Sequence, residues 1–362
     1  MKCKYLAFFA ALALLASCSK EDAPDPKAWV HDETLPVPVM FSMPKAMIQS
    51  KARITGTSLD GQRVGVMAVS RGSGSWETAT SDLVLLCNAP ATVKDDNDGN
   101  AGTLDFDNGN TVYYPMTNDR TFSFYGYYPR GAIQLSDGGG LFTVEYTNLG
   151  QTDILWAESQ ATELDGIQGF NARYVRNVEQ NHAGEAATYL PHLEFEHKLT
   201  ALKFTVQAVG TPVEGLKVRR IIVKNVPTTV TLWVANKSDS EDGKYSGRIF
   251  GGSDRGDIPV LNSTGSNPNV PVTATEMDAG EVMLLPQATY NVEVETQINN
   301  GSVQTIKGLT LTIEGGSFEA GKVYGYKVLV TSPSEVKFVA VSLKDWEDGF
   351  AGGTPEDLQI GE

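Results

Sequence analysis

Apolar side chains stand at every second position in one short segment after another, and this alternation constrains the fold more than any other feature of the sequence. In residues 290–298, for example, Tyr290, Val292 and Val294 are separated by Asn and Glu. Successive side chains of a β-strand point to opposite faces of a sheet, so a period of two indicates a strand with one buried face. Outside residues 5–16, no window of about 12 or more residues has the 3.6-residue period of a helix. The alternation recurs at residues 37–43, 64–68, 121–125, 142–146, 202–208, 309–313, 324–330 and 336–343.

The length of the chain and its many turn-forming residues predict two all-β domains. The chain has 362 residues, which include 36 Gly and 17 Pro. At roughly 100–200 residues per domain, two domains fit, and many short strands divided by turns are typical of β-sandwiches. The polar stretch 177–187 marks the predicted boundary, which gives domains at residues 54–185 and 186–362. Near residue 200 the apolar positions change from odd to even, and we expect a β-bulge near Ala201.

Charge and cysteine content exclude several classes of protein. The 29 Lys+Arg residues against 44 Asp+Glu residues give a formal net charge of −15. An acidic chain repels a phosphate backbone, so we expect no nucleic-acid partner, and the charge suits solubility outside the cell. With 3 Cys, the sequence has neither a disulfide scaffold nor a Cys-rich zinc module.

Residues 1–17 have the features of an export signal. Lys2 and Lys4 precede the apolar run 5–16, which is too short to span a bilayer as a helix. The run ends in Leu-Ala-Ser and is followed by Cys18, a sequence that resembles a bacterial lipobox. In that motif the chain is cut before the cysteine, which is acylated, so we expect a lipid on Cys18 that anchors the chain in the outer membrane. The alternative is a simple secretory peptide with an incidental cysteine.

Residues 18–53 are predicted to form a tether and a separable strand. The first part, residues 19–35, is polar and contains prolines, which is typical of a tether. Pro36 and Pro38 lack the N–H group that a sheet ladder needs, so the strand that follows is expected at a sheet edge. The polar residues 49–55 come next and suit an exposed loop. The apolar face of the strand consists of Val37, Val39, Phe41 and Met43.

No motif for catalysis or metal binding emerges, so we expect no enzyme, no cofactor and no metal. A Gly-x-Ser-x-Gly elbow, a Walker loop and a His-Glu-x-x-His helix are all absent from the sequence, and nothing selects a glycosidase-like pair among the many carboxylates. The acidic stretch from Asp95 to Asp98 is a candidate calcium-binding loop. It lacks the Gly and the bidentate Glu of an EF-type loop, and we interpret it as a solvated hairpin tip. His182, His192 and His197 are spaced so that they do not share one strand face.

Several segments, taken in their order along the chain, resemble the fimbrillin family, the pilin subunits of Bacteroidota type V pili. Each segment is short, but together they cover nearly the whole chain. They are the lipobox ending at Cys18, the strand 62–68, the aromatic stretch 122–129, residues 153–157, the strand 195–204, Leu-Leu-Pro-Gln at 284–287, residues 318–326 and Lys-Asp-Trp at 344–346.

The resemblance implies two transthyretin-like β-sandwich domains and an assembly that begins with proteolysis. In the family, an arginine-specific protease cuts the lipidated precursor after an N-terminal strand. An extended segment of the next subunit then fills the groove that the strand leaves, which is β-strand addition. Arg53 resembles the cleavage position. Arg63 and Arg71 are rivals, but cleavage there would remove folded core.

The expected function is therefore a structural or tip subunit of a fimbrium that supports adhesion. Its expected partners are other pilin subunits, the arginine-specific protease and a host or bacterial surface ligand. Residues 19–22, Ser-Lys-Glu-Asp, resemble the signal that sends lipoproteins of Bacteroidota to the outer face of the outer membrane. One face of the last predicted strand carries Val336, Phe338 and Ala340, and this strand is either part of the core or the donor segment.

The alternative is a surface lipoprotein that binds glycans and does not polymerise. Exposed tryptophans stack well on sugars, but tryptophan is more often a core residue or an interface anchor. The candidates for that role are Trp76, Trp156, Trp233 and Trp346.

Overall fold

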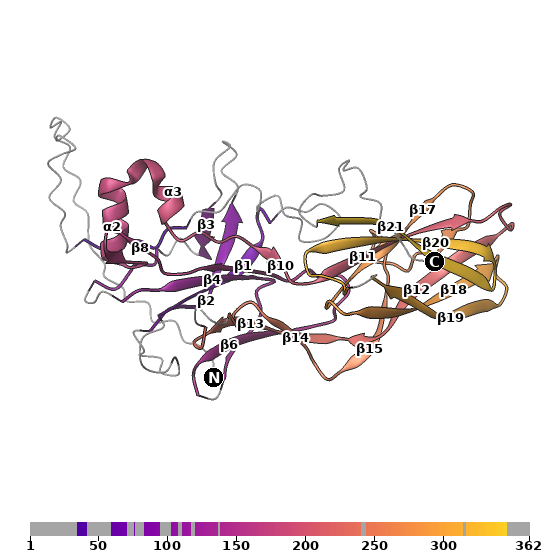
Figure 1. Ribbon diagram of the computed structural model, residues 1–362, viewed down its shortest axis with the longest axis horizontal. Helices are drawn as coiled ribbons and strands as arrows, with labels where there is room; N and C mark the ends of the chain where they lie inside the picture. Colours follow the sequence, from indigo (N-terminus) through magenta and orange to yellow (C-terminus); the bar gives the residue numbers. More distant parts are fainter. Residues whose placement is uncertain are drawn as a thin grey trace.

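The computed structural model describes residues 35–41, 59–70, 76, 83–94, 103–107, 111–116, 120–136, 138–239, 244–313 and 316–345. Its strands form an N-terminal and a C-terminal region that follow one another along the long axis of the molecule (Figure 1). The all-β prediction is confirmed, and the segment 290–298 lies within a single strand. No helix in the described residues is long and apolar enough to cross a membrane.

The N-terminal region is built on a six-stranded antiparallel sheet with the order β10-β7-β4-β1-β2-β3. A four-stranded sheet with the order β14-β13-β6-β5 packs against it, and β8 and β9 form a small separate pair. The strands are β1 (Arg63–Val69), β2 (Val84–Lys94), β3 (Thr103–Phe106), β4 (Ser123–Tyr128), β5 (Ile133–Leu135), β6 (Leu141–Thr147), β7 (Leu155–Ser159), β8 (Glu163–Leu164), β9 (Ile167–Gln168), β10 (Glu196–His197), β13 (Thr229–Asn236) and β14 (Ile249–Gly251).

The C-terminal region consists of two further sheets. One has the order β17-β11-β20-β21, in which β11 and β20 are parallel, and the other has the order β15-β12-β18-β19, with β16 also paired to β12. The strands are β11 (Thr200–Ala208), β12 (Leu216–Pro227), β15 (Arg255–Pro259), β16 (Val270–Pro271), β17 (Met277–Leu284), β18 (Thr289–Ile298), β19 (Val303–Thr312), β20 (Lys322–Ser332) and β21 (Glu335–Asp345).

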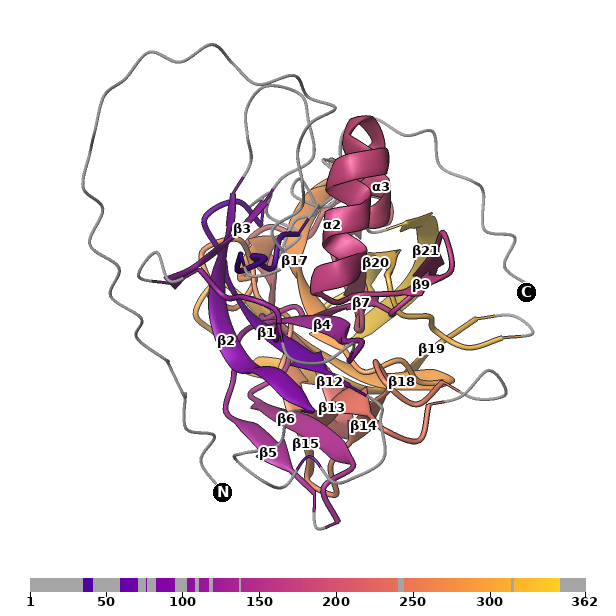
Figure 2. The same ribbon diagram turned by 90° about the vertical axis from the view of Figure 1, so that its left-hand side faces the viewer.

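Both faces of the six-stranded sheet are buried. Val66 and Phe124 belong to a cluster on the helix side of the sheet, which we call the helix-side core. Met67 and Tyr125 point the other way, into a continuous core that extends into the C-terminal region. Because β1 and β4 lie between two layers, their side chains are apolar at consecutive positions rather than at alternate ones. Figure 2 shows this order, with the helices, the six-stranded sheet and the four-stranded sheet one above another.

The stretch 177–187, predicted as a polar boundary, lies instead in a short helical segment. α2 (Ala172–Asn181), η3 (Ala183–Glu185) and α3 (Ala186–Tyr189) follow one another there. Asn171 caps α2, because its side-chain Oδ1 accepts a hydrogen bond of 2.9 Å from the Tyr174 amide. Tyr174, Val175 and Val178 are fully buried on one face of the helix, and this packing fixes α2 against the sheet.

Strand pairing crosses the predicted boundary between residues 185 and 186. β10 pairs with β7, and β13 pairs with β6, so strands from both sides of that point share the two N-terminal sheets. Near residue 200 the apolar positions change from odd to even because the chain passes from one sheet to another. Between His197 and Thr200 the chain passes from the six-stranded sheet to the sheet of β11, whose pairing is regular at Ala201. The predicted bulge near Ala201 is therefore wrong. The pairing of β11 with β17 is irregular opposite Phe204 and Thr205 instead, where Ala279 of β17 is the extra residue.

Candidate functional site

The segment 35–41 lies on the helix side of the six-stranded sheet. Val37, Val39 and Phe41 are only 5%, 7% and 8% exposed and belong to the helix-side core. The Phe41 ring meets the Phe124 ring edge-on, with 5.0 Å between their centroids, and lies 5.9 Å from the Phe106 ring. The alternating apolar residues of the segment therefore cover a part of the sheet face that would otherwise be open to water.

The backbone of this segment pairs with residues 112–114. The amide of Val39 donates to the carbonyl of Val112 at 2.7 Å, and the amide of Tyr114 donates to the carbonyl of Val37 at 2.9 Å. Pro38 lies opposite Tyr113 in an antiparallel bridge, between these two bonds. A proline at this position loses no ladder hydrogen bond, which explains how a proline-containing segment pairs here.

Side-chain burial contributes more to holding the segment than its few hydrogen bonds do. Among the described residues, one hydrogen bond adds to those two backbone bonds. The Arg176 guanidinium of α2 donates to the carbonyl of Leu35 at 2.8 Å. A neutral hydrogen bond contributes a net of only about 0.5–1.5 kcal/mol. Each of the three buried apolar side chains contributes roughly 1.5–3 kcal/mol. A strand that offers the same alternation of side chains could therefore replace this one.

Tyr114 lines the groove that the segment 35–41 fills, which we define by Phe106, Tyr114 and Phe124. Its side chain is 2% exposed, its ring lies 6.2 Å from that of Phe124, and its hydroxyl has no hydrogen-bond partner among the described residues. Burial, with a smaller contribution from the nearby Tyr174, raises the pKa of the Tyr114 hydroxyl well above its usual range. The groove is thus apolar and uncharged, which suits an apolar strand.

Several predicted site residues lie outside the described part of the chain. They are Cys18, Met43, Arg53, Arg71, the loop from Asp95 to Asp98, and Trp346. Arg63, a rival to Arg53 as the cleavage position, is the first residue of β1 and forms an ion pair with Asp107. Cleavage after Arg63 would therefore break this ion pair and remove the first residue of a core strand.

The last strand, β21, lies at the edge of its sheet. It pairs with β20 from Lys322–Asp345 to Ser332–Glu335. Val336 is 6% exposed, whereas Phe338 and Ala340 are half-buried. The Phe338 ring lies 5.9 Å from the ring of Phe204 and 6.4 Å from that of Tyr326. In this structure β21 thus packs as an edge strand that has one paired neighbour.

The three histidines considered as metal ligands lie in different segments, and His192 is in the connection between α3 and β10. His182 follows α2 and contacts Asp165 at 2.8 Å, whereas His197 of β10 contacts Asp153. Hydrogen bonds from Asn177 and then His182 lower the pKa of Asp165. No group of three His, Cys, Asp or Glu side chains in the described residues is arranged to hold a metal ion.

Sequence reasoning did not find the contact between Asp153 and His197. The Oδ2 atom of Asp153 lies 2.5 Å from Nδ1 of His197, and both side chains are at most 1% exposed. Asp153 also accepts a hydrogen bond from the Ile154 amide at 2.8 Å. The two residues come from two separate motifs, 153–157 and 195–204, and the structure shows that these motifs meet as neighbouring strands.

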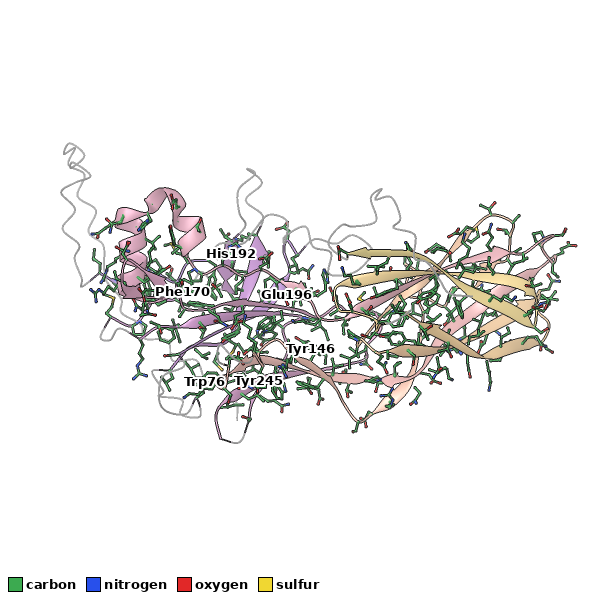
Figure 3. All side chains as sticks on the ribbon, in the orientation of Figure 1. Trp76, Tyr146, Phe170, His192, Glu196 and Tyr245 are labelled. Carbon is green, nitrogen blue, oxygen red and sulfur yellow. The ribbon has the colours of Figure 1, made fainter. Side chains whose placement is uncertain are left out.

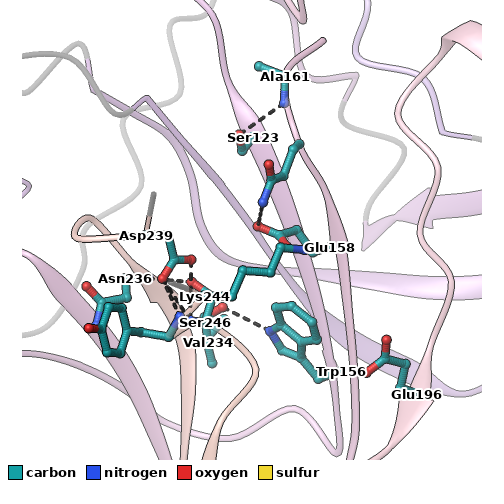
Figure 4. A network of polar contacts seen from close by, with 12 residues as sticks. Ser123, Trp156, Glu158, Ala161, Glu196, Val234, Asn236, Asp239, Lys244 and Ser246 are labelled. Atoms are coloured by element: carbon teal, nitrogen blue, oxygen red, sulfur yellow. Dashed lines mark hydrogen bonds and ion pairs between the residues drawn. The ribbon is translucent and has the colours of Figure 1, made fainter. Parts of the chain in front are cut away.

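Trp76 and Trp156 are core residues and are not available to stack on sugars. They are 3% and 5% exposed. Trp76 stacks on Phe142 at 5.3 Å, on the side of the six-stranded sheet opposite Phe170 (Figure 3). The indole N–H of Trp156 donates to the carbonyl of Val234 at 3.0 Å, which joins β7 to β13 (Figure 4). Trp233 is half-buried against Phe250, with 4.7 Å between the ring centroids.

Fold and site together define an all-β protein whose N-terminal segment completes a hydrophobic face of its sheet. The chain belongs to the fimbrillin-like family, whose profile matches residues 52–346. No curated protein sequence matches it.

One solved structure supports the fold, and two others are similar at lower TM-scores. A protein of Bacteroides uniformis assigned to cell adhesion superposes with a TM-score of 0.51 at 16% identity, covering 86% of this chain and 98% of that one. A fimbrial assembly protein from Parabacteroides distasonis has a TM-score of 0.43 at 11% identity, with coverages of 87% and 97%. The C-terminally truncated tip fimbrial protein Mfa3 from Porphyromonas gingivalis has a TM-score of 0.35 at 9% identity, with coverages of 86% and 100%.

Proposed function

We propose that this protein is a structural or tip subunit of a fimbrium at the cell surface, with no catalytic role. It is exported as an outer-membrane lipoprotein with acyl chains on Cys18. An arginine-specific protease cuts it after Arg53, and donor-strand exchange with other pilin subunits assembles it. Membership of the fimbrillin-like family supports the subunit role.

The observation that carries the proposal is the packing of the segment 35–41. Its residues Val37, Val39 and Phe41 fill an apolar groove, but few backbone bonds hold them. Cleavage after Arg53 leaves this segment bound without a covalent link to the subunit. A donor strand from another subunit would bury a similar apolar face and restore the ladder bonds to residues 112–114. Cleavage is thereby coupled to polymerisation.

The proposal is tested by tethering the segment to its groove. Pro38 and Tyr113 lie directly opposite one another in the antiparallel bridge. Their replacement by cysteine, Pro38→Cys with Tyr113→Cys, therefore allows a disulfide. The purified full chain is treated with an arginine-specific protease. We expect the doubly substituted chain to be cut but to form no detergent-resistant ladder until a reductant is added.

Each single cysteine variant serves as a control and should polymerise after cleavage. A ladder formed by the oxidised tethered chain would show that the groove is not the assembly site. N-terminal sequencing of the assembled material should begin at Ile54, and Arg53→Ala should abolish both the cut and the ladder. Assembly by Arg53→Ala at the normal rate would refute Arg53 as the processing position.

A further inference from the structure

A β-bulge in β12 places three cationic side chains on the outer face of its sheet. Val218 lies opposite Thr296 and Arg220 lies opposite Glu295, so Arg219 is the extra residue. Val218 and Ile221 are fully buried, whereas Lys217, Arg219 and Arg220 are half-buried and line one depression on the outer face. Strict alternation would have turned one of two adjacent arginines inward, and the bulge is what allows both to face solvent.

A loop arches beside these cations. The other edge of β12 pairs with β16 near Lys217 and with β15 from Ile222 onward, so residues 261–269 leave the sheet between the two strands. The amide of Asn269 donates to the carbonyl of Arg219 at 3.2 Å. Inside the loop, Oδ1 of Asn262 accepts hydrogen bonds from the amides of Thr264 and Ser266, each at 3.0 Å. These bonds give the loop a defined shape.

The loop and the strands enclose a depression of about 670 Å³. Lys217, Arg219 and Arg220 supply its cationic wall, and amides including Asn262, Asn267 and Gln297 supply much of the rest. Among the described residues, no aromatic side chain lines it, and Pro268 is the only apolar residue that does. A site of this volume accommodates a small ligand, but its lining suits a charged, hydroxylated ligand rather than an apolar one.

The positive charge of the depression is only partly compensated. Nη1 of Arg220 lies 3.5 Å from Oε1 of Glu295, and its Nε atom is buried without an acceptor among the described residues. Lys217 and Arg219 form no ion pair with any carboxylate in the described part of the chain. On a chain with a net charge of −15, such a cluster attracts an anion locally, and an arginine fork matches a carboxylate or a sulfate in geometry.

We propose that this depression binds an acidic saccharide. The guanidinium groups would bind its carboxylate or sulfate, and the amides would bind its hydroxyl groups. An acidic peptide is disfavoured, because Pro268 is the only apolar residue that the described lining offers to its side chains. The site lies in the half of the molecule away from α2 and the segment 35–41 (Figure 1), so it is separate from the groove that this segment fills.

The test measures binding of the purified full chain to sialyllactose and trigalacturonate, with lactose and maltotriose as neutral counterparts. We expect the acidic sugars to bind at least tenfold more tightly than the neutral ones, and more weakly as salt is raised. Arg219→Gln should weaken acidic-sugar binding by roughly tenfold to a hundredfold, because it removes a charge-assisted hydrogen bond. Asn267→Asp, in an exposed loop position, should weaken it by repulsion.

Lys307→Gln is the matched control, because Lys307 is an exposed cation on β19 of the same sheet and does not line the depression. It should leave binding unchanged, and thermal melting checks that every variant is folded. The proposal is overturned if the unsubstituted chain binds no acidic sugar. It is equally overturned if Arg219→Gln binds as well as the unsubstituted chain, or if a hexaglutamate peptide binds as tightly as the acidic sugars.

Discussion

At the residue scale, the groove is defined by side chains that could not be recognised as partners in the sequence. The apolar face of the segment 35–41 was predictable, because alternation alone identifies Val37, Val39 and Phe41. The contacts of Phe41 with Phe106 and Phe124 were not predictable, because they join residues about 65 and 83 positions apart. Similarly, nothing in the sequence pairs Asp153 with His197.

Tyr114 gives a prediction at this scale. Burial raises the pKa of its hydroxyl above the value of about 10 in an unfolded chain. The contribution of Tyr114 to stability is therefore intact below pH 10 and falls as the pH rises further, because only the unfolded chain ionises easily. Since the hydroxyl has no partner among the residues that the structure describes, we expect Tyr114→Phe to leave stability at pH 7 unchanged or raised by up to about 1–3 kcal/mol. The Tyr114→Phe substitution should also reduce the loss of stability between pH 10 and pH 12.

Urea unfolding at pH 7 and pH 11 measures both effects. Tyr290→Phe is the matched control, because Tyr290 is also buried with a raised pKa but donates a hydrogen bond of 2.7 Å to the carbonyl of Leu285. The Tyr290→Phe variant should lose about 1 kcal/mol at pH 7. A larger loss at pH 7 for Tyr114→Phe than for Tyr290→Phe would mean that the Tyr114 hydroxyl is bonded after all.

At the element scale, β21 is the strand whose place in the fold suits a role in assembly. It is an edge strand at the end of the described chain, and within the described residues it pairs with β20 alone. Edge strands expose unpaired backbone groups and are natural partners for strand exchange. We propose β21, with Val336, Phe338 and Ala340 on one face, as the donor strand.

Locking β21 to β20 tests this role. Leu329 lies directly opposite Lys337, and neither is buried, so Leu329→Cys with Lys337→Cys allows a disulfide across the pair. After cleavage, the locked subunit should accept a donor strand from another subunit but should not provide its own β21 as a donor strand. Added to the unsubstituted protein, it should shorten the ladder, and a reductant should restore its length. A locked subunit that polymerises alone as well as either single variant would assign β21 to the core.

The helix α2 shows why one element escaped prediction. It has only ten residues, and its buried face rests on Tyr174, Val175 and Val178. Such a short periodic pattern is hard to separate from a polar loop. The usable signal was Asn171, a favourable N-cap residue immediately before the helix.

At the scale of the whole molecule, the two regions share strands. The chain leaves the C-terminal region after β12, forms β13 and β14 in the N-terminal four-stranded sheet, and returns through β15. The contact between Trp156 and Val234 and the ion pair between Lys244 and Glu158, at 2.8 Å, strengthen this connection (Figure 4). The N-terminal sheets therefore depend on residues far along the chain.

This dependence predicts that the fragment 54–185 does not fold alone. It contains β5 and β6 but lacks β13 and β14, so half of its second sheet is missing and apolar residues such as Phe142 and Val144 lose their cover. We expect the fragment to give no cooperative unfolding transition and a flat near-ultraviolet circular dichroism spectrum. The full chain, measured alongside, should unfold cooperatively. A cooperative transition in the fragment would contradict the shared sheet.

The sequence by itself determined the all-β class, the positions of β1, β4, β6, β11 and β18 to β21, the family resemblance and the apolar face of the segment 35–41. These properties are local, because alternation states which side of a strand is buried and needs no knowledge of its neighbours. Only the tertiary structure decided which strands share a sheet, that β1 and β4 are buried on both faces, and that Arg219 and Arg220 point the same way. Those outcomes depend on pairing between residues distant in the chain, and the period of a strand carries no information about its partner.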